Sequence, residues 1–521
     1  MGILKAASLI AIISLISKVF GLVRQQVIAA YFGTTFVVDA FVYASILPFG
    51  FAIIMLAGLN GPFHSSIVSV ISKYKATEQT KEIKSTVFTI VVLTTIFMSL
   101  LTILTYCFAP QIISVLGANL PEKTRALSII ELRIMSPMFI LSGLIGISYG
   151  ILNVEKMYFT PSFSPIMVSL SVMGAIFIAS PENRPVALAW GSLVGVLLQF
   201  LLQLVPLLKK LPDYISFSFL PKHAGVLSVF GILLPSSLSS TIGQVNIAIT
   251  GYFASGLGEG TISALTYANF VFQLPLGILL AALLVPVLPL LNESIMLNDN
   301  NVTFKKNINK SLRSIMFVCV PVIFIIFCCG EQVVQVLFQR GKFDASSTLL
   351  TYQILFMYTV SLIFYATRDL LVRVFYALNN AKIPFYTSLL SVALMFLFCW
   401  ILSQHFEILG IAFAISLVTI FNMVLLSYLL TQKIGNWFEL DTLKHLKRVL
   451  LATIPITGIC SLFNYIVEYN FNFKNFILLS VLLIITSFIY VYILYILKDE
   501  ETIMVVNKLT DKVKNRLVKV S

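Results

Sequence analysis

The chain has 521 residues, of which 58% are hydrophobic and only 11% are charged, with 35 Lys and Arg against 22 Asp and Glu. Soluble domains carry about 25% charged residues, so this composition excludes a soluble globular protein and predicts a polytopic membrane protein. The six cysteines and four histidines show no spacing typical of a disulfide framework or a metal site. The sequence also contains no P-loop, HExxH or G-x-S-x-G motif. We therefore expect no enzymatic activity, cofactor, metal or nucleic-acid partner.

The first apolar segment, residues 6–32, is long enough to cross a bilayer, which takes about 20 apolar residues. It nevertheless carries Lys18 near its middle and Arg24 two turns further on. A charge at the bilayer centre costs at least about 2.5–3.5 kcal/mol, so such residues usually face a water-filled cavity or a partner. The next segment places the carboxylate of Asp39 in apolar surroundings. We interpret the three residues as lining a cationic cavity for an anion; the alternative is that the two cations snorkel to opposite interfaces.

Fourteen apolar segments follow one another, and all are too long and too little alternating to be barrel strands. They lie at about residues 6–32, 36–58, 86–108, 126–152, 159–180, 186–207, 224–254, 261–291, 312–338, 346–378, 385–404, 408–431, 449–467 and 475–497. We therefore expect an all-α membrane protein with about 14 transmembrane helices. An even number of spans puts both termini on one side. The loops and termini on that side hold 24 Lys and Arg against six in the opposite loops, so the positive-inside rule makes it the cytoplasm.

The two halves of the chain resemble each other. YGILNVEKMYFTPS at residues 149–162 is echoed by YALNNAKIPFYTS at residues 376–388, and YASILP ending at Pro48 is echoed by YANFVFQLP ending at Pro275. The nearly equal offsets of 226 and 227 residues indicate a parallel repeat of six helices with a binding site between the halves. We predict four regions: an N-lobe (residues 1–222, helices 1–6), a C-lobe (223–432, helices 7–12), helices 13 and 14 (433–498), and a basic cytoplasmic tail (499–521) on an anionic inner leaflet.

Several longer stretches resemble one known family. They are SKVFGLVRQQVIAAYFG, which is followed by DAF and LP, then YGILNVEKMYFTPSFSPI, LLPSSLSSTIGQVNIAITGYFASGL, LFQRGKFDASST and RVFYALNNAKIPFY. Together with the two extra C-terminal helices, they resemble the MurJ/MviN lipid II flippases of the multidrug/oligosaccharidyl-lipid/polysaccharide (MOP) exporter superfamily. The resemblance implies two six-helix lobes around a central cavity, with helices 13 and 14 forming a groove for a polyprenyl tail.

The cargo implied by this resemblance is lipid II, an undecaprenyl-pyrophosphate-linked disaccharide peptide. The protein would move it by alternating access from the inner to the outer leaflet of the bacterial plasma (inner) membrane, for peptidoglycan and cell-wall synthesis. The implied partners are this lipid and the surrounding membrane lipids. No residue pattern bears on the oligomeric state, for which a monomer is the default expectation.

The resemblance also assigns roles to individual residues. Lys18, Arg24 and Asp39 fall where the family has functional basic, basic and acidic residues. Ala52 and Phe270 stand where relatives commonly have further cavity arginines. Helix 11 lacks the Asn and Asp that would match the sodium ligands of some members, so the resemblance carries over no metal site.

Asn269 and Gln273 are two further candidates for substrate binding, because a spacing of four residues puts both on one face of helix 8. There they could hydrogen-bond the sugars of the cargo; hydrogen bonding between helices is the alternative. We expect Asp369 to form a local ion pair with Arg368. Two other functions stay open, a channel and a MOP-type transporter of another lipid-linked oligosaccharide or an amphiphilic drug.

Overall fold

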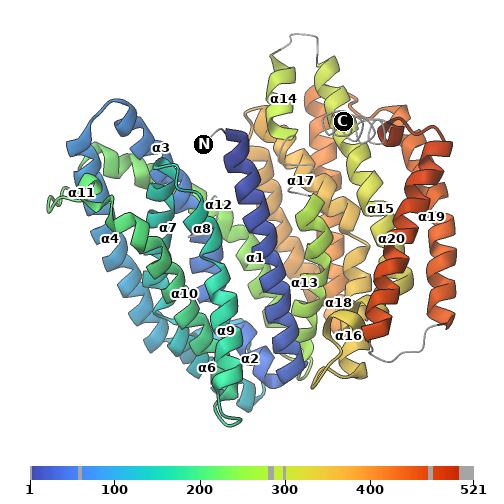
Figure 1. Cartoon of the computed structure of the whole chain (residues 1–521), viewed down its shortest axis with the longest axis horizontal. Coiled ribbons are helices and arrows are strands. Elements are labelled where there is room, and N and C mark those ends of the chain that lie inside the picture. The colour runs from blue at the N-terminus through green and yellow to red at the C-terminus, as the bar shows by residue number, and fades with distance from the viewer. Residues whose placement is uncertain (1–2, 57–60, 280–286, 297–300, 467–472, 504–521) are drawn as a thin grey trace, which may run out of the picture. The chain divides into compact units, whose positions relative to one another are not determined.

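The computed structural model describes residues 3–56, 61–279, 287–296, 301–466 and 473–503, and the regular elements in these ranges are helices (Figure 1). The hydrocarbon core of a membrane offers no hydrogen-bond partners, so a spanning segment must satisfy its own backbone groups, as a helix does. The prediction of an all-α membrane protein is confirmed.

Prolines mark several boundaries between the helices, because proline has no N–H to donate to the turn before it. Pro137 separates α6 from α7, and Pro165 separates α8 from α9. In chain order the helices are α1 (Ile3–Phe32), α2 (Phe36–Ser45), the π-helix η1 (Ile46–Leu56), α3 (Pro62–Ala76), α4 (Thr80–Cys107), α5 (Ala109–Leu116), α6 (Glu122–Met135), α7 (Met138–Val154), α8 (Phe159–Phe163), α9 (Ile166–Ile178), α10 (Arg184–Leu208), α11 (Leu211–Tyr214), α12 (Ala224–Ala254), α13 (Thr261–Leu279), α14 (Val287–Ile295), α15 (Val302–Phe338), α16 (Ala345–Thr359), α17 (Leu362–Ala377), α18 (Lys382–Ile434), α19 (Leu440–Ile466) and α20 (Phe473–Ile496).

Within the described ranges, nine helices are long and apolar enough to cross a membrane, and the number rises to eleven when two bent pairs are each counted as one span. The pairs are α6 with α7, bent by 43°, and α16 with α17, bent by 45°. The 53-residue α18 holds two predicted segments, separated at Glu407, whose φ of 49° is not helical. α1 and α13 cover two more predicted segments. The expected fourteen spans are therefore consistent with the structure.

The chain forms two compact units. Unit 1 consists of Met1–Ser263 with Gly341–Phe343, and unit 2 consists of Ala264–Arg340 with Asp344–Ser521. Helix α12 packs within unit 1 against α3, α4 and η1. The N-lobe and C-lobe predicted from the sequence repeat meet between residues 222 and 223. That boundary was inferred from the duplication of the sequence and not from packing, so the two lobes stay a prediction.

Two glycines allow the end of α1 to pack against a distant loop in unit 1. Gly33 and Gly341 both have positive φ, of 64° and 59°, which glycine adopts without strain. A Cβ on Gly341 would lie 2.1 Å from the carbonyl oxygen of Ala30, and the N–H of Lys342 donates to that oxygen at 2.8 Å. The RGKF stretch is therefore held against the last turn of α1.

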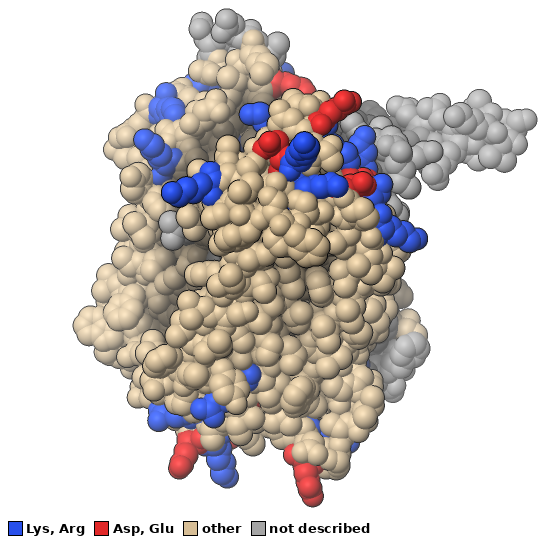
Figure 2. Space-filling model, turned by 90° about the vertical axis from the view of Figure 1, so that its left-hand side faces the viewer, with Lys and Arg blue, Asp and Glu red and all other residues tan. Residues whose placement is uncertain are grey.

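One face of the molecule has the charge distribution that a bilayer requires. Figure 2 shows a broad belt without Lys, Arg, Asp or Glu, with charged side chains toward both ends. On unit 1, α4 exposes the apolar side chains of Ile96, Phe97, Leu100 and Ile103, each by 51–61%. A contiguous exposed apolar surface of this kind is typical of contact with lipid chains.

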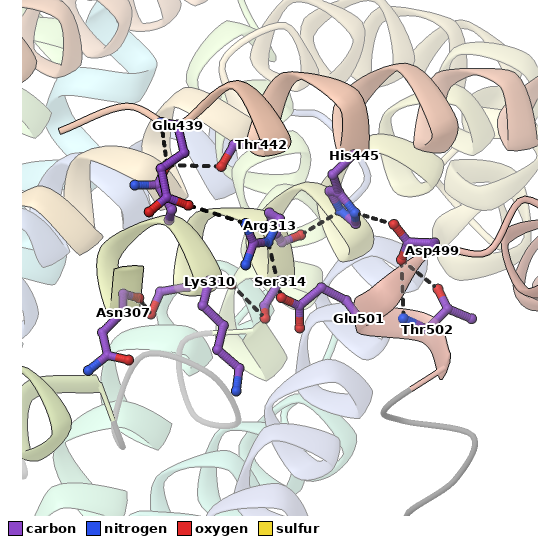
Figure 3. A network of polar contacts seen from close by, with 12 residues as sticks. Asn307, Lys310, Arg313, Ser314, Glu439, Thr442, His445, Asp499, Glu501 and Thr502 are labelled. Carbon is purple, nitrogen blue, oxygen red and sulfur yellow. Dashed lines mark hydrogen bonds and ion pairs between the residues drawn. The ribbon is translucent and has the colours of Figure 1, made fainter. Parts of the chain in front are cut away.

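In unit 2, a buried polar cluster ties the chain after α20 to α15 and α19 (Figure 3). We call it the C-terminal clasp; it consists of Arg313, His445, Asp499, Glu501 and Thr502. His445 and Asp499 are each 2% exposed and lie 2.6 Å apart, from Nδ1 to Oδ1. The Nε2 of His445 lies 3.0 Å from the backbone carbonyl of Arg313, and the Nε of Arg313 lies 3.1 Å from Glu501.

Both ring nitrogens of His445 face hydrogen-bond acceptors. Nε2 lies against the backbone carbonyl of Arg313, and Nδ1 lies against the carboxylate of Asp499. Burial by itself would raise the pKa of the Asp499 carboxyl, but its bond to His445, the electrostatic interaction with His445 and the bonds from Thr502 together hold that pKa below its ordinary range. Asp499 is therefore an acceptor held in place by the groups around it.

Asp499→Asn is expected to lower the stability of the protein, because it removes the anionic partner of a buried pair with His445. Removing one partner of a buried pair costs about 3–5 kcal/mol. Since the pKa of Asp499 is depressed on folding, its contribution is fully present above the ordinary carboxyl pKa of about 3.9 and is lost as the pH falls through the folded pKa. Thermal unfolding in detergent, measured against pH, should therefore show a melting temperature that falls in acid. The fall should be smaller in Asp499→Asn than in the unmodified protein.

The matched control is Asp441→Asn on the same helix α19. Asp441 pairs with Lys444 at 2.8 Å, but the two side chains are 71% and 67% exposed, so their loss should change the melting temperature little. Equal melting temperatures for Asp499→Asn and the unmodified protein at neutral pH would show that the clasp does not stabilise the fold.

Candidate functional site

The two cations of α1 lie in different surroundings within unit 1. Lys18 is exposed, and so are the nearby Leu15 and Val19, by 58% and 53%. Arg24 is half-buried, and its Nε is buried without a hydrogen-bond partner. Six residues separate them, so they project about 120° apart around the helix axis. Among the described residues, neither cation has an ion pair with an acid.

Asp39 lies in the first turn of α2, is 4% exposed, and binds the start of another helix. One carboxylate oxygen accepts the N–H of Gly260 at 2.6 Å, and the other accepts the N–H of Ser263 at 2.9 Å. These N–H groups belong to the free N-terminus of α13, where the helix has no internal acceptors for them and its dipole favours an anion. Asp39 therefore caps α13 from a neighbouring helix.

The cap is reciprocal. The side chain of Glu259, which immediately precedes this turn of α13, accepts the N–H of Phe36, the first residue of α2, at 2.8 Å. Each helix thus receives an acid from the other at its N-terminus. A pocket of about 10 Å³ beside the two acids, lined also by Tyr43 and Thr124, has room for about one water molecule.

This arrangement differs from an Arg24–Asp39 pair, which the cavity interpretation would allow in the empty state. Both oxygens of Asp39 are already engaged by backbone N–H groups that a helix terminus holds in place. No ion pair between Arg24 and Asp39 occurs in the part of the chain that the structure describes. Asp39 and Arg24 therefore do separate tasks in this conformation.

In unit 2, Asn269 and Gln273 lie on α13 with exposed side chains, and Phe270 between them is half-buried. The two polar side chains share a face, as their spacing predicts. Exposure on one face leaves both amides free to contact a ligand. Their role in substrate binding stays a prediction.

The position of Ala52 explains why it is not a cation in this chain. Ala52 lies in η1, is 0% exposed, and packs in the apolar core of unit 1 with Phe63, Ile67 and Ile90. An arginine at this site would bury its guanidinium among hydrocarbon side chains. Next to it, Gly50 leaves room for the side chain of Gln244, whose Oε1 would be 2.6 Å from a Cβ at residue 50.

Other intramembrane charges have local structural partners. Arg133 donates from Nε to the carbonyl oxygen of Tyr106 at 3.3 Å and lies over the Tyr106 ring. Arg368 pairs with Asp369 at 2.7 Å and lies 4.1 Å from the centre of the Tyr365 ring. The predicted ion pair between Arg368 and Asp369 is confirmed. In the described ranges, no group of three or more His, Cys, Asp and Glu is arranged to hold a metal ion.

Sequence reasoning missed one buried acid. Glu131 of α6 is 0% exposed, and neither of its carboxylate oxygens has a hydrogen-bond partner. Arg133 is only two residues away along the chain. Residues two apart on a helix lie about 200° apart around its axis, so they face different neighbours. The signal that could have identified Glu131 was therefore its position on the buried face of α6 with Ser128 and Met135.

The chain is similar to known proteins in family, sequence and fold. A family model described as lipid II flippase MurJ matches residues 28–482. A probable lipid II flippase MurJ of Synechocystis sp. is 35% identical over 448 residues, covering 83% of this chain and 83% of that protein. The lipid II flippase MurJ of Burkholderia cenocepacia is 27% identical over 392 residues, covering 74% of this chain and 75% of that protein.

Solved structures share the fold. One titled lipid II flippase MurJ, inward closed conformation, superposes with a TM-score of 0.77 at 22% identity and covers 94% of this chain and 98% of its own. An inward-facing multidrug resistance MATE family transporter of the MOP superfamily superposes with a TM-score of 0.69 at 14% identity, covering 83% of this chain and 98% of its own. The fold is therefore that of the MOP transporters.

Asp39→Ala is expected to destabilise the protein by about 0.5–2 kcal/mol, the usual cost of a lost helix cap, because two buried N–H groups lose their acceptor. Asp39→Asn keeps one side-chain oxygen and should lose less. The measurement is thermal unfolding of the purified protein in detergent. Glu259→Gln is the matched control, since its amide oxygen can still accept the N–H of Phe36. A melting temperature unchanged in Asp39→Ala would show that the reciprocal cap carries no stability.

Proposed function

The chain belongs to the lipid II flippase MurJ family, and we propose from this membership that it moves lipid II from the inner to the outer leaflet of the bacterial inner membrane. The observation that carries the proposal is the pair of cations on α1. Lys18 is exposed, and the Nε of Arg24 is buried without a hydrogen-bond partner, so both cations retain donors for an anion that enters the protein. A pyrophosphate group supplies the negative charge that such residues need within a membrane.

The pyrophosphate would be held by charge-assisted hydrogen bonds, which are roughly twice as strong as neutral ones and gain further in a low dielectric. Asn269 and Gln273 expose amide groups suited to the hydroxyl and amide groups of the sugars. Binding of this kind requires no covalent chemistry, so we propose a transporter and not an enzyme.

The polyprenyl tail would stay in contact with lipid and with α19 and α20. These helices pack on each other and expose large apolar side chains, among them Leu451, Ile454, Phe488 and Tyr492 at 54–74%. Moving a polyprenyl chain into water would cost about 0.8 kcal/mol for each methylene group. Only the polar head therefore needs to enter the protein.

We further propose that transport proceeds by alternating access and that both termini are cytoplasmic. In such a cycle the reciprocal cap between α2 and α13 would have to open when the conformation changes. Its hydrogen bonds can be replaced by bonds to water, so opening costs little once the site is wet.

A second candidate function is transport of another lipid-linked oligosaccharide, and the burial of Ala52 favours it. Where relatives commonly place a cavity arginine, this chain has a 0% exposed alanine in an apolar core. Fewer cations would suit a cargo that carries less negative charge. Competition between lipid II and other lipid-linked sugars in the assay below separates the two candidates.

Arg24→Ala is expected to reduce lipid II flipping by about 10- to 100-fold, because a hydrogen bond to a charged group contributes about 1.5–3 kcal/mol. Arg24→Lys keeps the charge and should retain more activity. The measurements are flipping in proteoliposomes and complementation of cells depleted of their own flippase.

Arg133→Ala is the control for this experiment, since Arg133 is bound to the carbonyl oxygen of Tyr106 and should not contribute to flipping. Normal flipping by Arg24→Ala, with the protein present in the membrane at its usual level, would remove Arg24 from the binding site.

The proposed topology predicts opposite accessibility for two exposed lysines. Lys123 lies in the first turn of α6 and Lys433 lies in the last turn of α18. In a background without the native cysteines, Lys123→Cys should react with a membrane-impermeant reagent in intact cells, and Lys433→Cys only after the inner face is opened. The reverse pattern would place both termini outside the cytoplasm.

A further inference from the structure

The buried acid of α6 has no role in the function described so far. Glu131 is 0% exposed, and both of its carboxylate oxygens lack a hydrogen-bond partner. Its helix packs against α2, α10, α5 and α4 in unit 1 (Figure 1). A carboxylate at this place would lose its hydration, and no hydrogen bond from the protein would replace it.

Four ionisable groups of α2 and α6 bind other partners. Asp39, the acid of α2, is bound to the start of α13, and the hydroxyl of Tyr43 donates to Gly251. On α6, the Nη2 of Arg125 donates to Ala118. Arg133 donates to Tyr106, the tyrosine of α4.

The remaining charged groups lie at helix ends. α10 carries only Arg184, at its first residue and over the ring of Tyr31. α5 carries no charged residue, and α4 carries Lys81, Glu82 and Lys84 in its first turns. Glu122 and Lys123 are exposed in the first turn of α6. None of these groups forms an ion pair with Glu131.

An isolated buried charge of this kind is not tolerated; the group takes up a proton and becomes neutral. Glu131 is therefore a carboxylic acid in this conformation. When water or a cation reaches Glu131, the charged form is stabilised again and the group becomes a carboxylate. Ionisable residues inside membrane proteins commonly serve proton or ion pathways for this reason.

A polar stripe on α6 leads from Glu131 to the reciprocal cap. Thr124, Ser128 and Glu131 are buried and share one face of the helix, at spacings of four and three residues. Thr124 also lines the small pocket beside Asp39 and Glu259, which has room for about one water molecule. Opening of the cap would extend that pocket toward Glu131.

We propose that Glu131 is a proton-binding site that couples transport to the proton gradient. The carboxyl carries its proton while α2 and α6 are packed together, and releases it as H⁺, leaving a carboxylate, when the conformation that opens this interface admits water. One proton would cross the membrane in each cycle in the direction opposite to the lipid. The proposal rests on the proposed flippase function, and the two can fail independently.

The protonated acid can be detected directly. Infrared difference spectra of the full-length protein in lipid, recorded between neutral and alkaline pH, should contain the carbonyl stretch of a buried protonated carboxyl group. The band should be absent in Glu131→Gln and unchanged in Glu122→Gln, the matched control with an exposed acid on the same helix. A spectrum without such a band, or a band that persists in Glu131→Gln, would overturn the proposal.

Coupling is tested in proteoliposomes that contain lipid II. With one proton exchanged per cycle, a gradient of about one pH unit should shift the steady-state ratio of lipid II between the leaflets by about tenfold. Glu131→Gln should still equilibrate the lipid, but its ratio should not respond to the gradient. Wild-type flipping with no response to the gradient would overturn the coupling and leave the flippase function intact.

A third outcome separates the proton-binding hypothesis from the flippase hypothesis. An absence of lipid II flipping in the wild-type protein would overturn the proposed function, while the infrared band would still decide whether Glu131 binds a proton. The wild-type gradient measurement needs no substitution, so a variant that fails to fold does not remove the test.

Discussion

A polar group between apolar helices is stable only when another group satisfies it, and this constraint separates the structural acids and bases of the chain from the available ones. Asp39 is satisfied by the N–H groups of α13, Asp499 by His445, and Arg133 by a carbonyl oxygen. Arg24 and Glu131 retain unbonded polar atoms. The first lacks an anion, and the second is stable there as a neutral, protonated acid; an anion and a proton are the two ligands that a proton-coupled carrier of a pyrophosphate lipid would exchange.

The same constraint gives two histidines different roles. In unit 2, both ring nitrogens of His445 face acceptors, the carboxylate of Asp499 and the carbonyl oxygen of Arg313. In unit 1, the Nδ1 of His223 accepts the N–H of Gly225 at 3.1 Å and lies 3.1 Å from the hydroxyl of Thr86, while Nε2 faces Glu82. Identical side chains therefore bridge two chain segments in one unit and cap the start of α12 in the other.

The hydropathy pattern was sufficient to predict an all-α membrane protein, because spanning length and apolar composition are local properties. It also found Lys18, Arg24 and Asp39, whose charges are conspicuous in apolar segments. The partners could not be predicted in the same way. The backbone groups that bind Asp39 are 221 and 224 residues away, and no periodicity reports such a contact. Ala52 lies in a π-helix, where the usual spacing of helix faces no longer applies, so its burial required the structure.

The geometry of α1 also constrains how an anion could be passed along it. Lys18 and Arg24 are separated by about 9 Å of helix rise and by about 120° of rotation, so one compact anion cannot bind both in a straight helix. Gly21 lies between them, and a Cβ at that position would meet no other atom within 4 Å. A bend there meets no steric obstacle from neighbouring side chains. Either the helix bends at Gly21 to bring the cations onto one anion, or the anion moves from one to the other. On the first route both cations bind the anion together. On the second route a single helix provides two successive binding positions across the membrane.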